Sequence, residues 1–170
     1  AMAEKGIEKI AEGHKSIFVF SPRNGHEQLL DDSGKPIYGE DYEFDGKATM
    51  LEGKGNLDDK ITIISSGIAI HESMKAIELL KKEKVGPVRL INIASVRPID
   101  AAAIIQAALE TVHLLVVEDH SSESGIAAQV ADVIADFQLP CSLRRLGVNT
   151  YFPSAPSADL FLMAGIDAES

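Results

Sequence analysis

The densest group of side chains that could do chemistry is the run Glu118–Glu123, with the sequence EDHSSE. It follows an apolar segment typical of a buried strand, and in open α/β sheets ligands bind at the carboxyl ends of the strands. Two acids and a histidine there can bind a metal or transfer protons. The alternative is a solvated loop in which Ser122 or Ser124 caps the following helix. Strand alternation would turn the first and third side chains away from the second, so we favour the loop.

Two other segments carry groups that can bind an anion. Ser65-Ser66-Gly67 ends an apolar run just before a helical pattern, so its backbone N–H groups can hold an anion, although a tight turn of small residues is the simpler interpretation. Arg23 stands on a proline-stiffened turn after the apolar run Ile17–Phe20. Its guanidinium can bind a phosphate or carboxylate through two parallel bonds, or form a surface salt bridge, and the local sequence leaves both open.

The elements that must position these groups alternate regularly after residue 60. Short apolar runs, each predicted as a strand, begin 25 to 29 residues apart, and each gap contains one helical pattern. This spacing is typical of βαβ units, so we predict a three-layer α/β/α domain with a mostly parallel sheet. Ala48–Glu52 is a possible edge strand, and a last helix is expected from Ser157 to a left-handed cap at Gly165. The four predicted strands are Ile61–Ser65, Val88–Ala94, Leu114–Glu118 and Ser142–Leu146.

The first 40 residues are polar and lack the regular alternation of apolar strands and helices seen after residue 60. We expect a helix over Glu4–Glu12 and a strand over Ile17–Phe20, followed by a linker rich in Asp, Gly and Pro over Leu29–Asp41. These two elements are too small to form a core of their own. We therefore divide the chain into residues 1–40, the end of some larger domain with its linker, and residues 41–170, the α/β domain.

Composition narrows the possible functions. The 170 residues are 45% hydrophobic and 25% charged, which is normal for a globular protein, and the formal net charge of −10 opposes binding to nucleic acid or to anionic membranes. No apolar run approaches the length of a spanning helix, and the first ten residues do not read as a signal peptide. The single cysteine, Cys141, cannot form an internal disulfide, so we expect a reducing, cytoplasmic environment.

Taken in order, seven segments resemble the C-terminal third of the transketolases, thiamine diphosphate enzymes that move two-carbon ketol units between sugar phosphates. The chain departs from the family pattern at Ser124 and Ala127, where the family often has glycine. The matching segments are Phe18–Arg23, Gly46–Leu51, Ile61–Gly67, Ile70–Ser73, Arg97–Asp100, Val116–His120 with Gly125–Ala127, and Phe161–Asp167.

The resemblance implies an incomplete enzyme of the pentose phosphate pathway. Residues 1–40 would end the central pyrimidine-binding domain, and residues 41–170 would form the C-terminal domain. Thiamine diphosphate and Mg2+ would be held by the remaining transketolase domains, because the family's Gly-Asp-Gly motif is missing from this chain. The chain alone would then bind no cofactor and be inactive, contribute no catalytic residue, and supply contacts to a homodimer. Arg23 would contact the phosphate of the sugar phosphate substrate.

Two other kinds of protein remain possible at this point. One is another thiamine diphosphate enzyme with the same domain order, either a deoxyxylulose phosphate synthase or a 2-oxo acid dehydrogenase β subunit. The other is a non-enzymatic ligand-binding or regulatory α/β module that uses the carboxyl ends of its strands.

Overall fold

The computed structural model describes residues 2–13, 16–20, 27–31 and 33–170, and these divide into two compact units, residues 1–45 and 46–170. The first unit begins with the helix α1, Met2–Ala11. The predicted strand over Ile17–Phe20 is wrong, since residues 16–20 have no regular secondary structure. Phe18 and Phe20 are 84% and 88% exposed. A strand needs a neighbour for its backbone N–H and C=O groups, and no described residue pairs with this segment.

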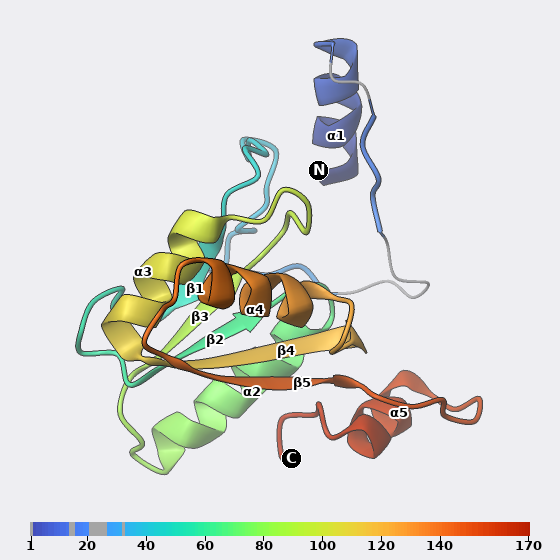
Figure 1. Cartoon of the computed structure of the whole chain (residues 1–170). Helices are drawn as coiled ribbons and strands as arrows, with labels where there is room; N and C mark the ends of the chain where they lie inside the picture. The colour runs from blue at the N-terminus through green and yellow to red at the C-terminus, as the bar shows by residue number, and fades with distance from the viewer. Residues whose placement is uncertain (1, 14–15, 21–26, 32) are drawn as a thin grey trace. The chain divides into compact units, whose positions relative to one another are not determined.

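The second unit contains one five-stranded sheet (Figure 1). The strand order is β1-β3-β2-β4-β5, and all neighbours are parallel except β1, which runs antiparallel to β3 at one edge. The predicted mostly parallel sheet and the predicted edge strand are therefore confirmed. The strands are β1 Thr49–Glu52, β2 Ile61–Ser65, β3 Val88–Asn92, β4 His113–Ser121 and β5 Ser142–Val148.

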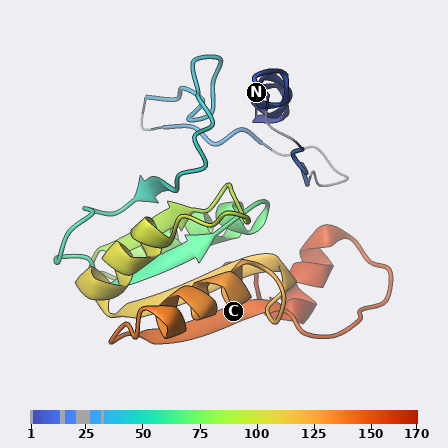
Figure 2. The same cartoon turned by 45° about the horizontal axis from the view of Figure 1, so that its top comes forward.

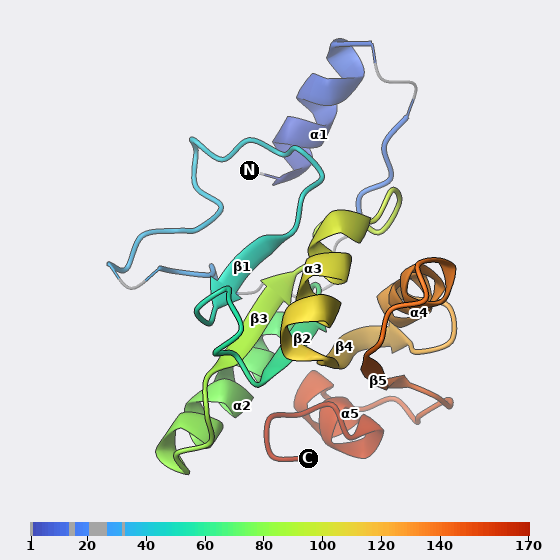
Figure 3. The ribbon, with the colours of Figure 1, turned by 60° about the vertical axis from the view of Figure 1, so that its left-hand side comes forward.

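Helices cover both faces of this sheet, which confirms the predicted three-layer architecture. Figures 1 and 3 show α2 on one face and α3 with α4 on the other, and Figure 2 shows α3 and α4 lying side by side. The main core packs Ile64 and Val116 of the sheet against Ile104 of α3 and Val130 of α4. The helices are α2 Ala69–Lys82, α3 Ala101–Thr111, α4 Ile126–Asp136 and α5 Ser157–Ala164.

Asp100 fixes the point where the chain enters the second unit. Its carboxylate caps α3 by accepting a hydrogen bond from the N–H of Ala103 at 3.3 Å, a role for which aspartate is well suited. The same carboxylate accepts the N–H of Ala48 at 3.0 Å, just before β1. One buried side chain thus joins the edge strand to the helix that crosses behind it.

The strand order places a topological switch point between β2 and β4. These strands are neighbours, yet β2 leads into α2 on one face and β4 leads into α4 on the opposite face. Ligands of open α/β sheets usually bind where two such connections diverge. No helix among the described residues is long and apolar enough to span a membrane.

Candidate functional site

The switch point brings together the two polar segments that the sequence singled out beside the strands. Ser65, at the end of β2, is buried and donates its hydroxyl hydrogen to the carbonyl oxygen of Val117 at 2.8 Å. Gly67 lies in the left-handed region with φ of 61°, and a Cβ on it would be 3.5 Å from Oδ1 of Asp119. The hydroxyl hydrogen of Ser65 thus ties β2 to β4.

The carboxylate of Glu118 lies against the amino end of α4, at the carboxyl ends of the strands. Its side chain is buried, and its two carboxylate oxygens accept hydrogen bonds from the N–H groups of Ile126 at 2.8 Å and Ala127 at 3.0 Å. These N–H groups open α4, where the helix dipole also favours negative charge. The predicted serine cap is therefore wrong, because a glutamate from the preceding strand caps this helix.

Gly125 makes this arrangement possible. A Cβ built on Gly125 would lie 1.8 Å from Oε2 of Glu118, which no side chain can tolerate. Its φ of −85° does not require glycine, so the requirement comes from the close approach of the carboxylate. The glycine therefore follows the run Glu118–Glu123 for a structural reason.

The rest of the run links the ends of β4 and β5. Ser122 donates its hydroxyl hydrogen to Oδ1 of Asn149, and its carbonyl oxygen accepts a bond from Nη1 of Arg145 at 3.2 Å. Asp119 and His120 remain exposed. Among the described residues, no group of three or more His, Cys, Asp or Glu side chains is arranged to hold a metal ion. The predicted solvated loop is wrong for Glu118–Ser121, because these residues continue the strand β4 and Glu118 is buried.

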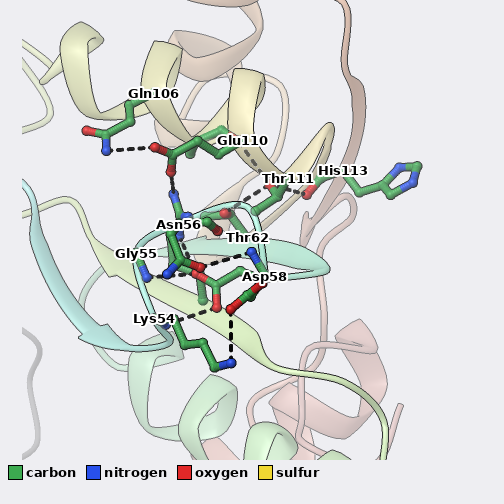
Figure 4. Close-up of polar contacts among 12 residues, drawn as sticks. Lys54, Gly55, Asn56, Asp58, Thr62, Gln106, Glu110, Thr111 and His113 are labelled. Atoms are coloured by element: carbon green, nitrogen blue, oxygen red, sulfur yellow. Dashed lines mark hydrogen bonds and ion pairs between the residues drawn. The ribbon is translucent and has the colours of Figure 1, made fainter.

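A second polar network lies at the other end of the strands, around the amino ends of β2 and β3 (Figure 4). Arg89 is buried; its Nε donates to Asp59 at 2.9 Å, its Nη2 donates to the carbonyl oxygen of Asn56 at 2.9 Å, and its Nη1 pairs with Glu110 at 2.6 Å. Asp59 also accepts the N–H groups of Lys54 and Gly55, each at 2.9 Å. The network joins the loop before β2 to β3 and α3.

Sequence reasoning missed this network, although one signal was present. Arg89 is the only charged residue in the apolar run 88–94, and a charge in a strand buried on both faces requires a partner. The loop between β1 and β2 passes close to the backbone of Arg89 at Gly53, which has a φ of 104°. A Cβ on Gly53 would lie 2.8 Å from Cα of Arg89, so glycine permits this approach. Its acidic partners lie 30 residues before and 21 residues after Arg89 in the sequence, which no local pattern connects.

The two acids of this network titrate below their ordinary range. Burial acts to raise the pKa of Asp59, but the hydrogen bonds from Lys54, Arg89 and Gly55 outweigh it, so the net shift is downward. The pKa of Glu110 is lowered first by the hydrogen bond from Gln106 and, against the effect of burial, by the bond from Arg89. Both carboxylates therefore favour the folded state when ionised.

This direction predicts an acid-sensitive fold. A carboxyl group with a lower pKa in the folded state adds stability above its unfolded pKa, and that stability is lost as the pH falls through the folded pKa. We therefore expect the free energy of unfolding, measured with urea, to fall steadily as the pH drops below about 5. The Arg89→Met variant should lose less stability over the same interval. An equal pH dependence in both proteins would contradict the assignment.

Arg23, the proposed phosphate ligand, lies outside the described residues. Cys141 is half-buried, and burial raises the pKa of its thiol, which makes the thiolate scarcer and the group less reactive.

Comparison with known proteins identifies the family of the chain. Residues 53–170 match the family described as "Transketolase, C-terminal domain". The chain belongs to this family. The predicted resemblance is thereby confirmed, and the five-stranded unit with its internally capped α4 is the transketolase C-terminal domain.

The similarity to individual transketolases extends along almost the whole chain. The chain is 31% identical to rat transketolase over 98% of its own length and 25% of that protein. It is 33% identical to a putative transketolase C-terminal section from Methanocaldococcus jannaschii, over 96% of this chain and 48% of that one. The chain thus spans about a quarter to a half of these transketolase relatives.

A solved transketolase structure has a similar fold. The transketolase fold described here matches a "Split gene transketolase, inactive beta4 tetramer" with a TM-score of 0.69 and 27% sequence identity, over 79% of this chain and 43% of that one.

Proposed function

We propose that this chain is the C-terminal part of a thiamine diphosphate-dependent transketolase, which transfers two-carbon ketol units between sugar phosphates. The observation that carries the proposal is the length of the similarity: rat transketolase aligns with 98% of the chain, so the alignment includes the first unit as well as the C-terminal domain. In the proposed enzyme this part provides subunit contacts and one substrate ligand, and it is inactive without the remaining domains.

Thiamine diphosphate and Mg2+ belong, in this proposal, to the remaining domains, because the residues described here do not fit them. The helix terminus most suited to a phosphate, that of α4, is filled by the Glu118 carboxylate. The described residues also include no cluster of carboxylates and histidines suited to a metal ion.

The first unit supports a role as the end of a neighbouring domain. The segment Ile17–Phe20 is four consecutive apolar residues, none of them buried among the described residues. An apolar segment of this kind, without regular structure of its own, is suited to adding a strand to the sheet of another domain, where its backbone groups would find partners. We place residues 1–40 at the end of the pyrimidine-binding domain on this basis.

The proposed assembly is a homodimer completed by the other transketolase domains. Oligomers of identical chains are usually symmetric, and one similar protein of known structure is described as an inactive beta4 tetramer. The test is reconstitution: the chain alone should show no ketol transfer, and adding the cofactor-binding domains of a transketolase should restore it. Failure of every such combination to transfer ketol units would contradict the proposal.

Arg23 is the residue through which this part would touch the substrate. In the completed enzyme, Arg23→Ala should weaken binding of phosphorylated sugars by roughly 1.5–3 kcal/mol, the scale of a charge-assisted hydrogen bond. Unphosphorylated substrates should be nearly unaffected, because they carry no dianion. The measurement is the ratio of kcat/KM for the two substrate types.

Arg23→Lys is the control for charge. It should recover only part of the loss, since an ammonium group keeps the charge without the planar fork. A surface salt bridge at this position would change stability slightly and leave the ratio of kcat/KM as it was. An unchanged ratio in Arg23→Ala would therefore remove Arg23 from the substrate site.

A further inference from the structure

A cavity of about 350 Å³ lies where the end of α2 meets the end of β1 and the amino end of β3. Ile77 and Val88 are buried in its wall, whereas Val85 is 47% exposed, so the cavity opens to solvent near Val85. This volume is at the small end of the range for ligand sites, which suits a molecule with a single ring. The apolar residues that line the cavity are Ile77, Leu80, Val85, Pro87 and Val88.

The turn after α2 fixes the shape of this cavity. Glu83 caps the helix, and Lys84 reverses the chain in the left-handed region with a φ of 60°. The N–H of Val85 then donates to the carbonyl oxygen of Leu80 at 3.0 Å, which brings these two lining residues together. Since backbone hydrogen bonds hold the turn, a ligand would need to order little of the chain.

The cavity is also lined by two charged residues, Glu52 of β1 and Lys81 of α2. Nζ of Lys81 lies 2.7 Å from Oε1 of Glu78 but 3.2 Å from Oε2 of Glu52. Two carboxylates and one ammonium group give this trio a net charge of −1, in a chain whose net charge is −10. The Glu52 side chain is 29% exposed, against 51% for Lys81, so water screens it less. The Glu52 carboxylate is therefore the group best placed to bind a second cation.

We propose that this cavity binds a small molecule with one apolar ring and a primary ammonium group. The ring lies against Ile77, Val85 and Val88, and the ammonium group bonds to Glu52. A carboxylate in place of the ammonium group would be repelled by the net negative charge, and a neutral group would gain no charge interaction. The site lies at the end of the strands opposite the switch point, and it does not depend on the proposed transketolase function.

A titration of the whole chain with phenethylamine tests the proposal. Followed by NMR, phenethylamine should shift the backbone N–H signals of Ile77, Gly86 and Val88 with a Kd on the order of 1 mM, the scale for so small a ligand. The neutral 2-phenylethanol should bind about fivefold more weakly, and the anionic 3-phenylpropionate more weakly still. Equal binding of the three compounds, or shifts centred elsewhere in the chain, would overturn the proposal.

Two variants separate the charged group from the ring. Glu52→Gln should weaken phenethylamine binding to the level of 2-phenylethanol and leave binding of the alcohol unchanged. Val85→Phe fills the cavity and should abolish binding of both compounds. Val96→Phe makes the same change at an exposed valine outside the cavity and should leave binding as in the wild type. A preference for the amine that survives in Glu52→Gln, or equal effects of the two phenylalanine variants, would contradict the assignment. Thermal unfolding checks that each variant keeps the fold.

The remaining transketolase domains provide the last control. The titration is repeated after the cofactor-binding domains have been added to the chain. Binding that persists supports a ligand site in the assembled protein, whereas loss of binding would show that another domain fills the cavity and would overturn the proposal. Ketol transfer measured in the same samples tests the proposed function separately, because neither result depends on the other.

Discussion

Replacing Arg89 with methionine is expected to lower the free energy of unfolding by about 3–5 kcal/mol, the usual effect of removing one partner from a buried ion pair. Methionine fills much of the same space, so the loss comes from leaving Asp59 buried without its cation rather than from a cavity. The carbonyl oxygen of Asn56 and the carboxylate of Glu110 also lose their donors. Urea denaturation followed by circular dichroism measures the change.

Lys81→Met is the matched control. Lys81 also pairs with two acids, Glu52 and Glu78, but its side chain is half-exposed and water screens the interaction. The same substitution there should cost only a small fraction of the loss at Arg89. Arg89→Lys should fall between the two, because a single ammonium group cannot reproduce three directed bonds. Equal losses at Arg89 and Lys81 would show that the buried network does not stabilise the fold.

The second large effect is expected at Gly125. Gly125→Ala places a methyl group where the Glu118 carboxylate now lies, so the carboxylate must leave the two N–H groups at the start of α4. We expect a loss of about 3–5 kcal/mol, the scale of leaving a buried charge without its partners. Thermal or urea unfolding of the chain gives the value.

Two variants at neighbouring positions sharpen this prediction. Ser124→Ala puts the same alanine one residue earlier, at an exposed position, and should change stability by less than about 0.5 kcal/mol. Glu118→Gln keeps the shape but loses the charge and turns an amide donor toward an N–H donor, at a cost of about 1.5–3 kcal/mol. If Gly125→Ala were as harmless as Ser124→Ala, the internal cap would not matter to the fold.

The fold was largely predictable because its signals are local and periodic. Short apolar runs at even spacing, each followed by one amphipathic helix, leave few arrangements other than a parallel sheet with crossovers. The exception is Ile17–Phe20, where local composition favours a strand but the described part of the chain offers no pairing partner. A strand forms there only if another strand pairs with it, and the local composition does not show whether such a partner is present.

The site was only partly predictable, because its decisive contacts join distant residues. The run Glu118–Glu123 was found from its composition, but the capping role of Glu118 depends on a turn that brings residues eight and nine positions later onto its carboxylate. The glycine at position 125 is understandable only once that contact is known. Likewise, the lone arginine in an apolar strand signalled a partner without showing which acids supply it.

The carboxylate of Glu118 can also be regarded as a ligand that the domain carries permanently. Since it is part of the same chain, it is present at the helix end at an effective concentration far above that of any dissolved competitor, on the order of millimolar or more for tethered groups. A free phosphate or nucleotide would have to displace it and leave a buried charge without partners. The carboxyl ends of the strands, where open α/β sheets usually bind ligands, are therefore already occupied at the start of α4 by a group of the domain itself.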